Sequence, residues 1–140
     1  MDNWTWGLSL IALTLAIHVT AVTLLASMLT TFRVWLESRT LGLLYLITIL
    51  VAAFTAMGLL LAVLHGMEAA IWAAAYLWLG ALDASATAIL YSVDTMSTRG
   101  ASGVMLPPHW QMMGALEAVD GMLLFGISAA FIFTLMQLYY

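Results

Sequence analysis

A few ionisable side chains interrupt the long apolar runs of this chain and are its candidates for chemistry. They are His18, His65, Glu68, Asp94, Arg99, Glu117 and Asp120. Glu117 and Asp120 are three residues apart, as are His65 and Glu68, so each pair shares one face of a helix. Ionisable groups within apolar helices usually face protein or water, where they pair or mark a pathway. Asp94, Arg99, Glu117 and Asp120 are therefore candidates for buried ion pairs, and Glu117 could instead bond to a Ser or Thr side chain of the helix expected at 83–96.

Metal or haem ligation is a second kind of chemistry to consider. His65 and Glu68 could hold a metal with His18 and Glu117, and His18 with His65 could ligate haem from neighbouring spans. Nothing in the spacing brings these groups together, and histidines within a membrane also serve as hydrogen-bonding packing groups. We therefore expect no metal and no cofactor. No nucleophile and base arrangement, phosphate loop or metalloprotease pattern occurs, so an enzyme is not expected either.

The composition defines the class of protein. Hydrophobic residues make up 65% of the chain and charged residues only 7%, which excludes a soluble domain and predicts a single all-α integral membrane domain over residues 1–140. The lipid bilayer is then the first partner, and without a basic patch nucleic acid is not expected. The absence of cysteine removes disulfides, thiolate catalysis and cysteine-ligated metals.

The apolar runs predict the elements that position these groups. Residues 5–32 form a first span, since about 20 apolar residues cross a bilayer core. Residues 40–82 form a second span with an outer extension, and residues 108–138 form the last. Arg33 and Arg39 place the loop between the first two spans in the cytoplasm. We expect the N-terminus outside, the C-terminus in the cytoplasm, and a bacterial inner membrane.

The segment after His65-Gly66 has two interpretations. In the first, the second helix extends to Leu82, Asp83-Ala84-Ser85 opens a new helix, and this short helix is re-entrant. In the second, residues 67–94 form a complete third span of a four-span bundle, which puts all three arginines of the chain on one side. We favour three spans with a re-entrant helix and loop at 83–103, because the turn at His65-Gly66 is short for a full reversal.

A polar, glycine-bearing segment follows that helix, and its flanks carry a specific pattern. It comprises Ser97, Thr98, Arg99, Gly100, Ala101, Ser102 and Gly103. Leu-Pro-Pro-His-Trp follows at 106–110, and residues 116–126 read Leu-Glu-Ala-Val-Asp-Gly-Met-Leu-Leu-Phe-Gly. In these features the second half of the chain resembles the pore-loop potassium channel superfamily. It is most similar to small bacterial ion channel proteins of the two-transmembrane pore-domain type with an extra N-terminal helix.

The resemblance implies a fold and a function. In that family four chains surround an axis, and the backbone carbonyls of Thr-Thr-X-Gly-Tyr-Gly-Asp replace the hydration shell of the ion. Here Gly100 keeps one glycine, while Ala101, Ser102 and Gly103 replace the tyrosine, the second glycine and the aspartate. The resemblance therefore implies a homotetrameric, channel-like pore whose diverged filter is not potassium-selective, so that the pore is weakly selective, differently selective or closed. A non-conducting accessory or structural subunit of a larger membrane complex is the alternative.

Arg99 stands where the family has a small apolar side chain that points behind the filter. The resemblance thus implies that Arg99 is neutralised by Asp94, with Glu117 as the second choice. If Arg99 faced the axis instead, four copies would make a cationic ring that attracts anions. A third alternative is that its long side chain extends to the outer surface.

Overall fold

Apolar runs become long helices here, because a helix satisfies its backbone polar groups internally, as a hydrocarbon environment requires. The computed structural model describes residues 2–139 and contains no strand among them. Its long helices are α1 (Asp2–Glu37), α2 (Leu43–Trp78) and α4 (Gln111–Tyr139). A short helix, α3 (Ser85–Met96), and the 3-10 turn η1 (Pro108–Trp110) connect α2 to α4.

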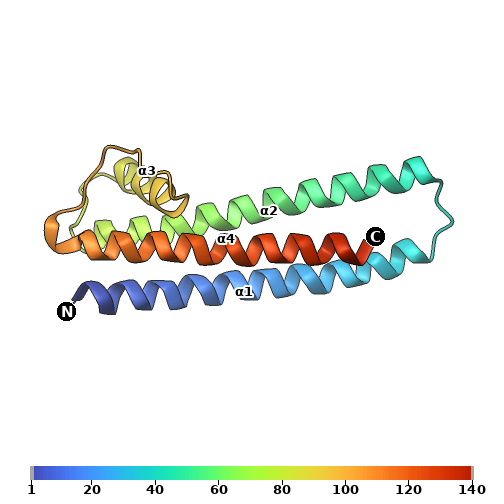
Figure 1. Ribbon diagram of the computed structural model, residues 1–140, viewed down its shortest axis with the longest axis horizontal. Helices are drawn as coiled ribbons and strands as arrows, with labels where there is room; N and C mark the ends of the chain where they lie inside the picture. The colour runs from blue at the N-terminus through green and yellow to red at the C-terminus, as the bar shows by residue number, and fades with distance from the viewer. Residues whose placement is uncertain (1, 140) are drawn as a thin grey trace.

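The three long helices lie side by side and alternate in direction (Figure 1). The loop between α1 and α2 lies at one end, and the start of α1, the end of α2 and the start of α4 lie at the other. Within the described residues, these three helices are long and apolar enough to cross a membrane. This confirms the all-α fold and agrees with an integral membrane protein. At 36 residues, α1 and α2 are each about 54 Å long, so both exceed a bilayer core of about 30 Å.

The four-span alternative is wrong, because His65-Gly66 does not reverse the chain and residues 67–78 continue α2 as one helix. The second helix is also shorter than the expected 40–82. It ends at Trp78, where Gly80 adopts a left-handed φ of 68° that closes the helix. Helix α3 begins at Ser85 after Ala84, and no side chain caps its first turn. At the other end of the chain, α1 runs beyond the predicted 5–32 to Glu37.

The distribution of polarity is that of a membrane protein. Large apolar side chains face outward along the long helices, as Leu44, Leu59 and Phe133 show. The buried side chains include most of the polar groups that interrupt the apolar runs: Thr14, His18, Glu68, Ser92, Asp94, Glu117, Asp120 and Ser128. Lipid tails offer no hydrogen bonds, so polar groups are stable only where the helices face one another.

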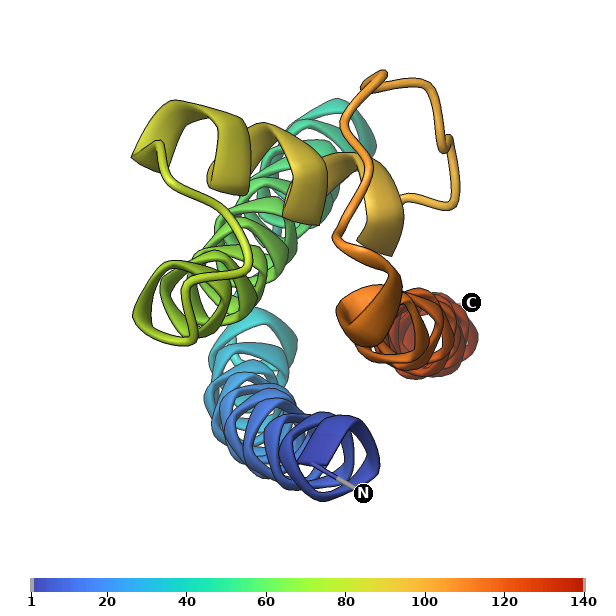
Figure 2. The same ribbon diagram turned by 90° about the vertical axis from the view of Figure 1, so that its left-hand side faces the viewer.

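Two glycines of α4 allow α3 to pack directly on that helix. A Cβ at Gly114 would clash with the Tyr91 hydroxyl, and one at Gly121 would clash with the Met96 carbonyl oxygen. Helix α3 therefore crosses obliquely from α2 to α4, as Figure 2 shows. Its last residue, Met96, meets α4 at Gly121, which lies ten residues, or about 15 Å, from the start of that helix. The chain then returns to the end where α2 finished (Figures 1 and 2).

The close contact at Gly121 gives the first prediction. Gly121→Ala should destabilise the protein by about 1–3 kcal/mol, because the added methyl group meets the backbone of Met96 and not a flexible side chain. Gly126→Ala is the matched control on the same helix, since no atom lies within 4 Å of its Cβ position. Thermal denaturation in detergent compares the two, and equal stability would show that α3 does not dock at Gly121.

Candidate functional site

One carboxylate organises the loop that follows α3. Asp94 lies in the last turn of α3, and its side chain is only 2% exposed. Its Oδ1 accepts a hydrogen bond from Arg99 Nε at 2.5 Å, and its Oδ2 accepts one from the backbone N–H of Ser102 at 2.7 Å. The Asp94 carbonyl also accepts from the Arg99 backbone N–H at 3.1 Å. A single residue thus holds the loop at two separated points.

Arg99 pairs with Asp94 and not with Glu117. Only the Asp94 side chain of this pair is buried, because the Arg99 side chain is 61% exposed in the single chain. Glu117 instead accepts a hydrogen bond from the Tyr76 hydroxyl of α2 at 2.8 Å. The geometry places the guanidinium against the carboxylate at the end of α3, where the two charges offset each other.

The charge of Asp94 depends on these partners. Partial desolvation opposes ionisation, but the hydrogen bond from Arg99, the Ser102 N–H and the positive charge of Arg99 outweigh it, and the pKa of Asp94 is lowered. The carboxylate is therefore ionised near neutral pH. Its contribution to stability is complete above the ordinary carboxyl pKa and is lost as the pH falls through the lowered value in the folded state.

The loop backbone adopts unusual angles next to the carboxylate. Gly100 and Gly103 have φ of 62° and 73°, which glycine adopts without steric cost. Thr98 has φ of 59°, an uncommon conformation for a β-branched residue that costs roughly 1–3 kcal/mol. Residues held in this way often cluster at functional sites, which makes the loop from 97 to 103 a candidate site.

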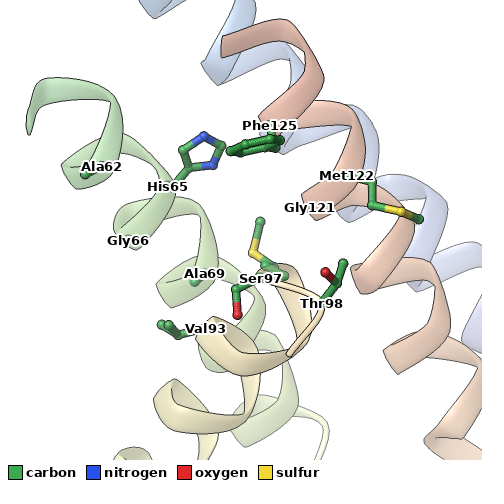
Figure 3. A pocket seen from close by; sticks show the side chains of 11 residues that line it. Ala62, His65, Gly66, Ala69, Val93, Ser97, Thr98, Gly121, Met122 and Phe125 are labelled. Carbon is green, nitrogen blue, oxygen red and sulfur yellow. The ribbon is translucent and has the colours of Figure 1, made fainter. Parts of the chain in front are cut away.

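A pocket of about 590 Å³ lies beneath the end of α3. Figure 3 shows His65 of α2 opposite Phe125 of α4, with Ser97 and Thr98 on the α3 side. The lining residues come from these three helices and the start of the loop: Ala62, His65, Gly66, Ala69, Val93, Met96, Ser97, Thr98, Gly121, Met122 and Phe125. The pocket therefore joins the loop to the polar interior of the long helices.

His65 belongs to a ring of four polar side chains in that interior. His18 Nδ1 lies 2.9 Å from Glu68 Oε1, and His18 Nε2 lies 3.0 Å from Ser128 Oγ. Ser128 Oγ lies 3.1 Å from His65 Nε2, and His65 Nδ1 lies 3.5 Å from Glu68 Oε2. The ring links α1, α2 and α4. His18, Glu68 and Ser128 are buried, while 28% of the His65 side chain is exposed.

Asp120 and Glu117 are buried, and among residues 2–139 their partners are neutral hydrogen-bond donors and not arginine. Asp120 Oδ2 accepts hydrogen bonds from Thr14 Oγ1 at 2.6 Å and Trp72 Nε1 at 2.8 Å. Glu117, as described, bonds to Tyr76. Neutral donors from neighbouring helices take the place of arginine, because the arginines of the chain lie at other positions.

Sequence reasoning missed Thr14, Trp72, Tyr76 and Ser128. A periodic signal was present, because polar or amphipathic residues recur at helical spacing within apolar runs. Thr14 and His18 are four residues apart, and Glu68, Trp72 and Tyr76 continue the same spacing. Such a stripe in an otherwise apolar helix predicts its inward face.

Three of the four side chains considered as metal ligands lie together. His18, His65 and Glu68 each place a ligand atom within 4.8 Å of the other two, whereas Glu117 does not belong to this group. Haem does not fit between the histidines. Their ring centroids are 5.1 Å apart and both rings contact the same serine, which leaves no room for a macrocycle.

Comparisons with known proteins assign neither a family nor a function to this chain. No protein-family model, curated protein or solved structure matches this chain.

The loop geometry gives a second prediction. Asp94→Asn should expose the loop to limited proteolysis, because it removes the charge that holds Arg99 and weakens the bond to the Ser102 N–H. Arg99→Leu in the same background should add little, since the partner of Arg99 is already lost. Asp83→Asn, an exposed change just before the same helix, is the matched control. Additive effects of the Asp94 and Arg99 changes would show that the two residues act independently.

A third prediction concerns pH. The amide proton of Ser102 should keep its hydrogen-bonded NMR shift at neutral pH and lose it on acidification, with a midpoint below the ordinary carboxyl pKa of 3.8. The direction follows from the lowered pKa of Asp94. A midpoint above 3.8, or no titration, would contradict the proposed anchor.

Proposed function

We propose that this chain is the subunit of a channel-like membrane pore related to the pore-loop potassium channels. In this proposal α3 is the re-entrant pore helix, and residues 97–103 line the ion pathway. One observation carries the proposal: α3 ends beside Gly121, well inside the span of α4, and the chain then continues as non-helical backbone.

The non-helical loop at 97–103 needs partners for its backbone polar groups. At membrane depth, irregular backbone is tolerated only where protein buries it or where it lines a watery cavity. In the single chain, Ser97, Thr98 and Gly100 are exposed. Further copies of the chain around a common axis would cover the loop and leave water along that axis. This supports the homotetramer that the sequence resemblance implies.

The loop supports permeation without potassium selectivity. A potassium filter needs successive carbonyls aimed at the ion, and here Asp94 draws Ser102 and Arg99 back toward the end of α3. Because Asp94 offsets the charge of Arg99, four copies would not form a strongly cationic ring. We therefore propose a weakly selective pore.

The proposed orientation follows from the arginines. Arg33 and Arg39 lie near the α1–α2 loop, at the end opposite to α3 (Figure 1). By the positive-inside rule this end is cytoplasmic, so α3 and its loop enter from the outer side of a bacterial inner membrane. The N-terminus is outside and the C-terminus is cytoplasmic.

The fourth prediction tests conduction. Reconstituted protein should give a current whose reversal potential, with potassium on one side and sodium on the other, lies near zero. Gly100→Ala should change the current, because alanine is strained at φ of 62° in the loop. Gly80→Ala is the matched control, as Gly80 has a similar φ of 68° and open space but lies outside the loop.

Two results would contradict this proposal. A reversal potential near that of potassium would show a selective filter. A monomer that carries no current would favour the accessory subunit of a larger complex.

A further inference from the structure

We infer that His18, His65 and Glu68 form a binding site for one divalent transition-metal ion of the Zn²⁺ class. The site lies inside the bundle of α1, α2 and α4. It does not depend on conduction through the α3 loop, so a failure of the pore proposal leaves it standing.

The ligand atoms lie close to the spacing of a metal site, since one atom from each of the three residues is within 4.8 Å of the other two. The Nδ1 atom of His18 lies 2.9 Å from Glu68 Oε1, and that of His65 lies 3.5 Å from Glu68 Oε2. Ligands of a tetrahedral Zn²⁺ ion are about 2.0–2.1 Å from the metal, which puts neighbouring ligand atoms about 3.4 Å apart. Two imidazoles and one carboxylate are a ligand set that Zn²⁺ accepts together with one water.

Ser128 orients both imidazoles for this role. Its Oγ lies 3.0 Å from His18 Nε2 and 3.1 Å from His65 Nε2. A hydroxyl oxygen can accept two hydrogen bonds, so both Nε2–H groups can donate to it. Both Nδ1 lone pairs are then directed to the side where Glu68 lies. An outer partner that fixes the imidazole tautomer in this way is a regular feature of metal sites.

One contact of the ring is left without a hydrogen. When Glu68 is ionised, two neutral imidazoles and one hydroxyl supply three hydrogens. These satisfy the hydrogen bonds His18–Glu68, His18–Ser128 and His65–Ser128 but leave none for the contact between His65 and Glu68. Glu68 Oε2 is correspondingly buried without a hydrogen bond, 3.5 Å from His65 Nδ1. A metal ion between the Nδ1 atoms and the carboxylate removes the mismatch. A proton on Glu68 is the competing solution, and the experiment below separates the two.

The charge of the interior also favours a cation. Glu68, Glu117 and Asp120 are fully buried, and each has one oxygen without a hydrogen-bond partner. Within residues 2–139 no arginine offsets them: Arg33 pairs with Glu37, Arg39 lies over Trp35 and Arg99 pairs with Asp94. Uncompensated charge in such an environment is costly, and a divalent ion reduces that cost.

An ion can reach the cluster from the pocket. His65 lines the 590 Å³ pocket beneath α3, whereas the other two ligands are enclosed. Figure 3 shows the His65 ring facing this space. The pocket can thus admit both the ion and the water that completes its coordination.

The experiment uses the purified full-length protein in detergent after chelator treatment. Titration with Co²⁺ should give the visible absorption bands of a tetrahedral ion at one equivalent per chain, and Zn²⁺ should displace it and raise the thermal denaturation midpoint. Glu68→Gln and His18→Ala should each weaken binding more than 100-fold. Ser128→Ala, which keeps all three ligands, should weaken it by about 10–100-fold. His109→Ala is the matched control and should bind as the unaltered protein does.

The outcomes decide between a metal and a proton. Folded, unaltered protein that binds neither Co²⁺ nor Zn²⁺ would overturn the inference and leave the ring as a hydrogen-bonded unit with protonated Glu68. Equal loss of binding in His109→Ala would assign the ion to another place. If His18→Ala fails to fold, the other two variants still test the site. Glu68→Gln keeps a polar side chain of the same size, and Ser128→Ala keeps all three ligands.

Discussion

Hydrocarbon offers no hydrogen bonds, and the structure of this protein depends on that constraint. Polar side chains of the long helices must find their partners within the bundle. Thr14 and Trp72 therefore meet at Asp120, and Tyr76 meets Glu117. These contacts fix the rotation of α1 and α2 about α4, because a helix turned to face lipid would expose a carboxylate.

In the proposed re-entrant arrangement, the same constraint acts on the backbone after α3. A helix can enter a membrane alone, but the loop at its end needs other partners for its N–H and carbonyl groups. Asp94 meets part of this need, since its Oδ2 accepts a hydrogen bond from the Ser102 N–H and its carbonyl oxygen accepts one from the Arg99 N–H. The remaining exposed groups of the loop need water or another copy of the chain, and this requirement connects the fold to the proposed pore. The mainly apolar pocket below the loop lies between Ser97 and Thr98 on one side and His65, a member of the buried ring with His18, Glu68 and Ser128, on the other.

Much of the fold is predictable from the sequence, because runs such as residues 43–64 are apolar on every side and long enough to span a bilayer. The end of α2 was less predictable. Alanine-rich residues favour helix up to Leu82, and only the conformation of Gly80 shows where the helix stops. The pairing of Asp94 with Arg99 was expected from the resemblance, and the two lie together. The sequence suggested that His18, His65, Glu68 and Glu117 could converge on a metal, but it did not show that only the first three meet, since spacing along one helix does not show which face of another helix it meets.

Side-specific labelling tests the central claim most directly, that the chain between α2 and α4 returns to the face from which it left. The chain has no cysteine, so single cysteines can be placed in a clean background by Ser38→Cys, Asp83→Cys and His109→Cys. A membrane-impermeant maleimide, applied to sealed vesicles before and after lysis, reports the side of each position. The account predicts that positions 83 and 109 are labelled from one side and position 38 from the other. Labelling of positions 83 and 109 from opposite sides would contradict it.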